Sequence, residues 1–201
     1  KSRTPTRTTG ILEFLVNISN SAANAPSDNE ATVPQKLYPT NGRPTRGDSQ
    51  RQDNNIEGMV WIDDVVINDY FNVLRRFSKA NICFMSTYLC IALERDKNYR
   101  LPNDYSQYDT LVIPVNDNRV HWALVVVGLK SNTITYYDSL SWKNRSIVML
   151  LQTFLTNHGF PEAQKWTVNY LDNKTIPTQT NTYDCGIFLL AYASASPSSY
   201  R

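Results

Sequence analysis

One cysteine in this sequence occupies a position suited to a reactive thiol. Cys185 is followed by Gly186 and an apolar run, within TNTYDCGIFLLAYA at positions 180–193. The thiolate is the nucleophilic form of cysteine, and a neighbouring base or imidazolium stabilises it, as does a helix N-terminus. Cys185 is therefore either a small apolar residue that opens a buried helix or a nucleophile, with Gly186 keeping the approach to the thiol open.

A nucleophilic thiol requires a base, and the sequence contains two histidines. His158 lies in the last turn of an amphipathic segment, where a histidine typically caps the helix and interacts with its dipole. His121 opens the apolar run HWALVVV after the polar stretch NDNR, which places it at a sheet edge beside a cleft. A histidine at a strand start is most often a surface residue. The next strand changes that assessment for His121, because it ends in a carboxylate.

Asp138 could orient the His121 ring. If a hairpin turns near residues 128–131, His121 and Asp138 lie opposite each other or within one residue of that register. Such residues point to the same face of a sheet, with Cβ atoms about 5 Å apart. The carboxylate would accept a hydrogen bond from one ring nitrogen and leave the other facing Cys185. Taken alone, Asp138 would be a turn residue, and Asp184, beside Cys185, is expected to shape the turn instead.

Acyl transfer also requires donors for the developing oxyanion. The backbone N–H of Cys185, at a helix start, is one candidate. Gln179 and Asn181, in the segment PTQTNTYDCG, each offer a side-chain amide. Residue chemistry alone does not decide between these two amides.

The elements that must position these residues alternate between helical and strand patterns. Apolar spacing predicts helices, and β-branched or aromatic runs predict strands. We expect helices at 63–77, 83–95, 146–159 and 185–193, and strands at 109–115, 121–129, 132–138 and 166–171. The expected class is α+β, with a small mixed β-sheet flanked by helices. Cys83 and Cys90 would then lie on one helix face in the core.

Composition limits the classes of protein to which the chain can belong. Apolar residues make up 41% of the sequence, charged residues 19%, and the net charge is +2, which fits a globular protein and does not favour nucleic-acid binding. Three cysteines favour a reducing, intracellular setting, in the cytoplasm or nucleus, and no apolar run is long enough to span a membrane. Residues 1–57 have the composition of a polar arm or linker.

Four motifs together resemble the Ulp/sentrin-type cysteine proteases, which cleave ubiquitin-like proteins, chiefly SUMO, from their conjugates. They are His121-Trp122, YYDS with Asp138, PTQTNTYDCG with Gln179 and Cys185, and WIDDVVINDYFNVL at positions 61–74. They occur in the family's order between about residues 59 and 193. The resemblance implies an Ulp/adenain-like fold over residues 58–201, as a catalytic domain trimmed at its C-terminus.

The resemblance also implies roles for individual residues. Cys185 would be the nucleophile, His121 the base, Asp138 the orienting acid and Gln179 the side-chain oxyanion donor. On the substrate side, the tryptophans Trp61 and Trp122 would close over the Gly-Gly end of the modifier, and Asp64 would help to bind its tail. Composition alone would assign both tryptophans to the core.

The expected activity is that of a thiol isopeptidase with no cofactor and no metal. Its partner would be ubiquitin or a SUMO- or NEDD-type modifier and its conjugates, and the chain would be a monomer. The motifs fit the SUMO branch, the NEDD branch and pathogen effectors that act inside a host cell about equally well, and several of those effectors prefer ubiquitin. Two alternatives stay open, namely an acetyltransferase on the same scaffold and a non-catalytic module that binds a ubiquitin-like protein.

Overall fold

A five-stranded mixed sheet organises the part of the chain that the structure describes. This structure is a computed structural model, and it describes residues 61–78 and 81–195. The strand order is β1-β2-β3-β4-β5, with β1 parallel to β2, β4 parallel to β5, and antiparallel pairing of β3 with both its neighbours. The elements are α2 (Asp64–Phe77), β1 (Ile82–Phe84), α3 (Tyr88–Arg95), β2 (Thr110–Asp117), β3 (His121–Gly128), β4 (Thr133–Tyr137), α4 (Arg145–Asn157), the 3-10 helix η1 (Ala163–Lys165), β5 (Thr167–Tyr170) and α5 (Cys185–Ala195).

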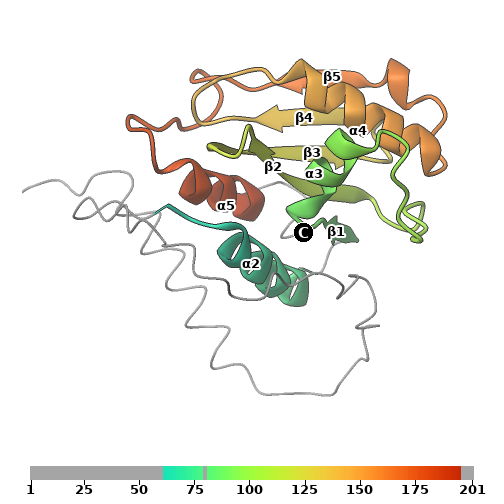
Figure 1. Cartoon of the computed structure of the whole chain (residues 1–201), viewed down its shortest axis with the longest axis horizontal. Coiled ribbons are helices and arrows are strands. Elements are labelled where there is room, and N and C mark those ends of the chain that lie inside the picture. Colours follow the sequence, from blue (N-terminus) through green and yellow to red (C-terminus); the bar gives the residue numbers. More distant parts are fainter. Residues whose placement is uncertain (1–60, 79–80, 196–201) are drawn as a thin grey trace, which may run out of the picture.

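Helices cover both faces of the sheet (Figure 1). Ala123 and Val125 of β3 belong to an apolar cluster with α3 and α4, whereas Trp122 and Leu124 belong to a second cluster with α2 and α5. Because β2 and β3 are buried on both faces, their sequences read as nearly continuous apolar runs. Cys185 belongs to the second cluster, so α5 is held against β3.

Most of the expected elements are present. Seven of them differ from the expected bounds by at most two residues at either end, and the sheet is mixed as predicted. The polar segment 1–57 lies outside the described residues. Among residues 61–78 and 81–195, none of the helices has the length and apolar character needed to cross a bilayer.

The helix expected at 83–95 is wrong in its first half. Ile82–Phe84 form β1, and α3 begins only at Tyr88. A short apolar run fits a strand and a buried helix equally well, and the parallel pairing with β2 decides for the strand. Cys83 and Cys90 therefore do not share a helix face, although both pack in or against the first apolar cluster.

Gly186 allows α5 to approach the segment that precedes α2. A Cβ at Gly186 would lie 2.7 Å from the Cβ of Ile62. The indole N–H of Trp122 donates to the carbonyl of Ile62 at 2.8 Å. Ile62 fills the space beside Gly186, so this glycine serves close packing and not, as expected, an open approach to the thiol.

The Gly186→Ala substitution is expected to lower the free energy of unfolding by about 1–3 kcal/mol, because the new methyl group overlaps Ile62. Urea unfolding measures the change. In the alanine background, Ile62→Gly removes the overlapping Cβ and should reduce the penalty, whereas Ile62→Ala keeps that atom and should not. A Gly186→Ala protein as stable as the parent would show that the two segments can separate without cost.

Candidate active site

Cys185 is the first residue of α5, and the loop before it is tied to the helix by hydrogen bonds. The side-chain carbonyl of Asn181 accepts from the backbone N–H of Tyr183 at 3.1 Å and of Asp184 at 3.0 Å. Its amide donates to the Asp184 carboxylate at 2.7 Å, and the Asp184 carbonyl accepts from the N–H of Phe188. Asn181 and Asp184 thus shape the turn that presents the thiol.

His121 and Asp138 form a buried hydrogen-bonded pair. The His121 Nε2 lies 3.0 Å from Asp138 Oδ1, and the two residues are 3% and 0% exposed. The expected register is wrong by a small margin, because Leu124 pairs with Tyr137 and an extended ladder would place Asp138 opposite Ala123. A shift of two residues keeps both side chains on the same face, since side chains alternate with a period of two. The pair therefore forms diagonally.

Hydrogen bonding distinguishes Cys185 from the other two thiols. Burial raises the pKa of Cys83 to about 11 and that of Cys90 to about 12. Burial acts in the same direction on Cys185, but hydrogen bonds from His121 and from the backbone N–H of Trp122 outweigh it and lower the pKa of this thiol. Among the cysteines, Cys185 is the one whose surroundings favour the thiolate.

The electrostatics of His121 complement those of the thiol. Burial lowers the pKa of the ring, but hydrogen bonds to Asp138 and Cys185 outweigh this effect and raise the pKa to about 9. Since Nε2 faces Asp138, Nδ1 is the ring nitrogen left for the sulfur. A lowered thiol pKa beside a raised imidazole pKa favours a thiolate–imidazolium pair near neutral pH.

This ion pair predicts a bell-shaped pH profile for any reaction that uses it. Below the lowered pKa of Cys185 the sulfur is protonated and not nucleophilic, and above about pH 9 His121 loses the proton it would donate. Alkylation of Cys185 by iodoacetamide should therefore have its midpoint below about 8.5, the ordinary value for a thiol. Mass spectrometry assigns the labelled cysteine, and a midpoint at or above the ordinary value would contradict the pairing.

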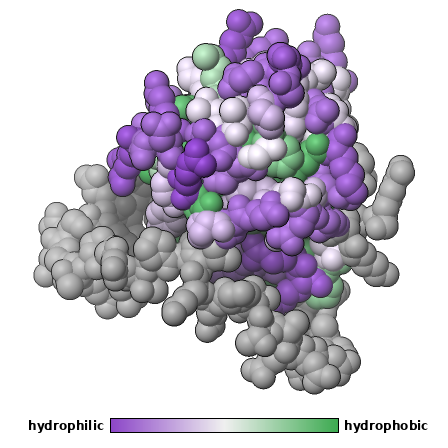
Figure 2. Space-filling view, turned by 90° about the vertical axis from the view of Figure 1, so that its right-hand side faces the viewer, coloured by the Kyte–Doolittle hydropathy of each residue, from purple (hydrophilic) through white to green (hydrophobic). Residues whose placement is uncertain are grey.

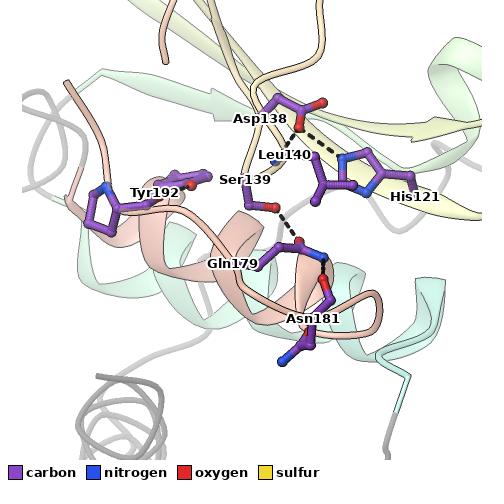
Figure 3. A network of polar contacts seen from close by, with 8 residues as sticks. His121, Asp138, Ser139, Leu140, Gln179, Asn181 and Tyr192 are labelled. Carbon is purple, nitrogen blue, oxygen red and sulfur yellow. Dashed lines mark hydrogen bonds and ion pairs between the residues drawn. The ribbon is translucent and has the colours of Figure 1, made fainter. Parts of the chain in front are cut away.

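Gln179 is held by a network that links it to the loop after β4 (Figure 3). Its side-chain oxygen accepts from the Ser139 hydroxyl, and its backbone N–H donates to the Ser139 carbonyl at 3.0 Å. Its amide nitrogen donates to the Asn181 carbonyl at 2.6 Å. That carbonyl can only accept, so it fixes which end of the amide is nitrogen and leaves one N–H for another acceptor. The Asn181 amide likewise donates one N–H, to the Asp184 carboxylate, so this pattern does not decide between the two amides, and the assignment of the oxyanion donor to Gln179 stays a prediction.

Of the residues expected to contact substrate, Trp122 lies beside the thiol. Trp122 is 7% exposed and packs in the same apolar cluster as Cys185, while Trp61 is 51% exposed and adjoins the Ile62 carbonyl to which the Trp122 indole donates. A cavity of about 370 Å³ beside Trp122 is lined by Asp64 and by Arg119, among others, but not by Trp61. The side of the described surface seen in Figure 2 is mostly hydrophilic, with small separate apolar areas.

Sequence reasoning missed two residues of the loop that follows β4. The N–H of Leu140 donates to Asp138 Oδ1 at 2.7 Å, so this carboxylate oxygen accepts two hydrogen bonds. The ring of Trp142 lies 5.0 Å from the ring of His121, measured between centroids. The run SLSW has no periodicity that would have revealed either contact.

Comparison with known proteins identifies the family. A family model described as the Ulp1 protease family, C-terminal catalytic domain, matches residues 60–196. The chain belongs to the Ulp1 protease family. The expected resemblance to Ulp/sentrin-type cysteine proteases is thereby confirmed, as is the expected fold.

The three named proteases that follow are each less than 30% identical in sequence to this chain. Human sentrin-specific protease 2 is 28% identical over 93% of this chain and 33% of its own length, so the chain spans about a third of that relative. The NEDD8-specific protease 1 of Arabidopsis thaliana is 28% identical over 69% of this chain and 66% of its own length. A solved structure of the SUMO protease Ulp1, with its catalytic cysteine oxidised to a sulfonic acid, is 26% identical over 67% of each chain, with a TM-score of 0.58.

Proposed function

We propose that this chain is a thiol protease that cleaves after the C-terminal Gly-Gly of ubiquitin or a ubiquitin-like modifier and releases it from conjugates or precursors. The observation that carries the proposal is the buried His121–Asp138 hydrogen bond beside Cys185, whose pKa His121 helps to lower, on the fold of a protease family. Residues 58–201 would form the catalytic domain, and the protein would act inside a cell. The names of the relatives, sentrin- and NEDD8-specific proteases, support a modifier as the substrate class.

In the proposed reaction, the Cys185 thiolate attacks the carbonyl carbon of the modifier's last glycine. The tetrahedral oxyanion would be stabilised by the backbone N–H of Cys185 and the free N–H of the Gln179 amide. The protonated His121 then gives its proton to the leaving amine as the C–N bond breaks. Asp138 keeps the ring oriented and stabilises its positive charge.

A thioester between Cys185 and the glycine remains after the amine departs. His121, now neutral, takes a proton from water, and the resulting hydroxide equivalent attacks the thioester carbonyl. Collapse of this second tetrahedral species breaks the C–S bond and releases the modifier with a free carboxylate. The proton that His121 holds at the end restores the thiolate–imidazolium pair.

The substrate-side residues are proposed to select the modifier's tail. Trp61, half exposed, and Trp122, buried at the thiol, would flank a path in which glycine residues fit because they have no side chains. Asp64 lines the neighbouring cavity and would contact a basic or polar group of the tail.

Parallel labelling tests this function and identifies the modifier. Ubiquitin, SUMO and NEDD8 probes with a C-terminal electrophile are incubated with the chain and with its Cys185→Ala variant. We expect a covalent adduct with at least one probe, located at Cys185 and absent from the variant. No adduct with any probe would contradict the proposal, and acetyl transfer from acetyl-coenzyme A in that case would identify an acetyltransferase. Non-covalent binding without an adduct would identify a binding module.

A further inference from the structure

The catalytic candidate His121 has one aromatic contact in the described part of the chain, and it is with Trp142. The ring centroids are 5.0 Å apart and the planes are inclined by 52°. His121 is 3% exposed although it begins a strand, whereas Trp142 is 52% exposed. The indole therefore stands between solvent and the imidazole, with its remaining surface outside.

The loop that carries Trp142 begins with a turn that accepts its hydrogen bonds at Asp138. Its first turn is closed by the hydrogen bonds from the Leu140 N–H to the Asp138 carboxylate and from the Ser141 N–H to the Asp138 carbonyl at 3.0 Å. Ser141 then adopts a φ of 59°, in the left-handed region that a residue with a Cβ enters at a cost of about 1–2 kcal/mol. This conformation directs the chain so that the next residue, Trp142, returns to the His121 ring.

We propose that Trp142 is a positioning residue. It covers the imidazole of His121, shields the His121–Asp138 hydrogen bond from water and holds the ring in one orientation. The inference rests on the proposed function of His121 as the base. It assigns Trp142 a role through the His121 ring and not through contact with the scissile bond or the thiol.

Two physical effects connect this contact to the ion pair. The Asp138 carboxylate is fully buried and its Oδ2 has no hydrogen-bond partner among residues 61–78 and 81–195, so the strength of its interaction with His121 depends on the exclusion of water. An aromatic ring within about 6 Å of a cation also favours the charged form of that cation, here the imidazolium. The first effect strengthens the hydrogen bond to Asp138, which outweighs the lowering of the pKa of the ring by burial, and the second favours the imidazolium directly. The other ionisable groups near the ring are Asp138, Cys185 of α5, and Asp117, its register partner on β2.

Two variants of Trp142 test the role. In Trp142→Ala, solvent reaches the His121 ring and its rotation is freer, so kcat should fall about 10-fold with KM within twofold of the parent. The midpoint of Cys185 alkylation by iodoacetamide should rise toward about 8.5, the ordinary value for a thiol. Trp142→Phe keeps an aromatic ring and should restore kcat to within about threefold and most of the midpoint shift.

A matched control separates the contact from the loss of an exposed apolar side chain. Met149 on α4 is 65% exposed and belongs to no site described above, so Met149→Ala should leave kcat, KM and the alkylation midpoint unchanged. Urea unfolding of each variant verifies that the fold is intact.

Three outcomes would overturn the inference. The first is a Trp142→Ala protein whose kcat and alkylation midpoint are unchanged. The second is a Trp142→Ala protein with a raised KM and an unchanged kcat, which would indicate that Trp142 contacts substrate. The third is a Trp142→Phe protein in which neither kcat nor the alkylation midpoint is restored. The alkylation midpoint requires no modifier. A midpoint that shifts in a protein without protease activity would therefore support the positioning role while contradicting the proposed function.

Discussion

Replacement of Cys185 by alanine is expected to reduce kcat for cleavage of a modifier substrate by at least about 10⁴-fold, to the level of background hydrolysis. The substitution removes the sulfur that would form the thioester, and neither His121 nor Gln179 can supply another nucleophile in its place. Binding of the modifier should persist, because its tail and folded body would contact residues other than the thiol. Single-turnover cleavage and equilibrium binding measure the two effects separately.

Cys90 offers a matched control for that experiment. Cys185 and Cys90 are each 1% exposed, but burial raises the pKa of Cys90 and its thiol lies near the carbonyl of Pro114, 3.8 Å away. Cys90→Ala removes the same atoms from the core and should lower stability without slowing cleavage. If Cys185→Ala still cleaves, the nucleophile is a different group and the proposed function must be abandoned.

Replacement of Asp138 by alanine is expected to lower kcat by about 10²–10⁴-fold. His121 would lose the acceptor at 3.0 Å that orients its ring and helps to raise its pKa. Because the folded-state pKa of His121 would fall, the ring would lose its proton at a lower pH. The alkaline limb of the activity profile should therefore move below about pH 9, the value in the parent. The pH dependence of kcat/KM measures both effects.

Asparagine at position 138 separates hydrogen bonding from charge. Its side-chain oxygen can still accept from His121 and from Leu140, whereas its amide nitrogen would occupy the place of Oδ2, which is buried and has no partner within the described part of the chain. We expect Asp138→Asn to be intermediate in kcat and less stable than the parent, with urea unfolding as the check. Equal activity of Asp138→Ala and the parent at every pH would show that the carboxylate has no role in orienting the base.

Much of the site could be predicted from the sequence because local patterns constrain it strongly. A thiol at the start of an apolar helix, a histidine at the start of one strand and an acid at the end of the next are each visible in a short window. The error of two positions in the register did not separate His121 from Asp138, because strand side chains alternate with a period of two. The roles assigned to these residues stay predictions until the experiments above are done.

The prediction of a helix over the first half of residues 83–95 was wrong for a related reason. An apolar run of three residues carries no period that distinguishes strand from helix, and pairing of Ile82–Phe84 with β2 decides its conformation. Pairing of this kind depends on residues more than twenty positions away in the sequence, which no local pattern reports.

The sequence by itself thus determined which residues could do chemistry and on which elements they lie, because hydrophobic period and residue type are local properties. The tertiary structure alone decided how those residues are held. Gly186 makes room for Ile62, Ser139 fixes the amide of Gln179, and Trp142 covers His121. Each of these contacts joins segments at least twenty residues apart in the sequence, where close packing and directional hydrogen bonds, and not periodicity, select the partner.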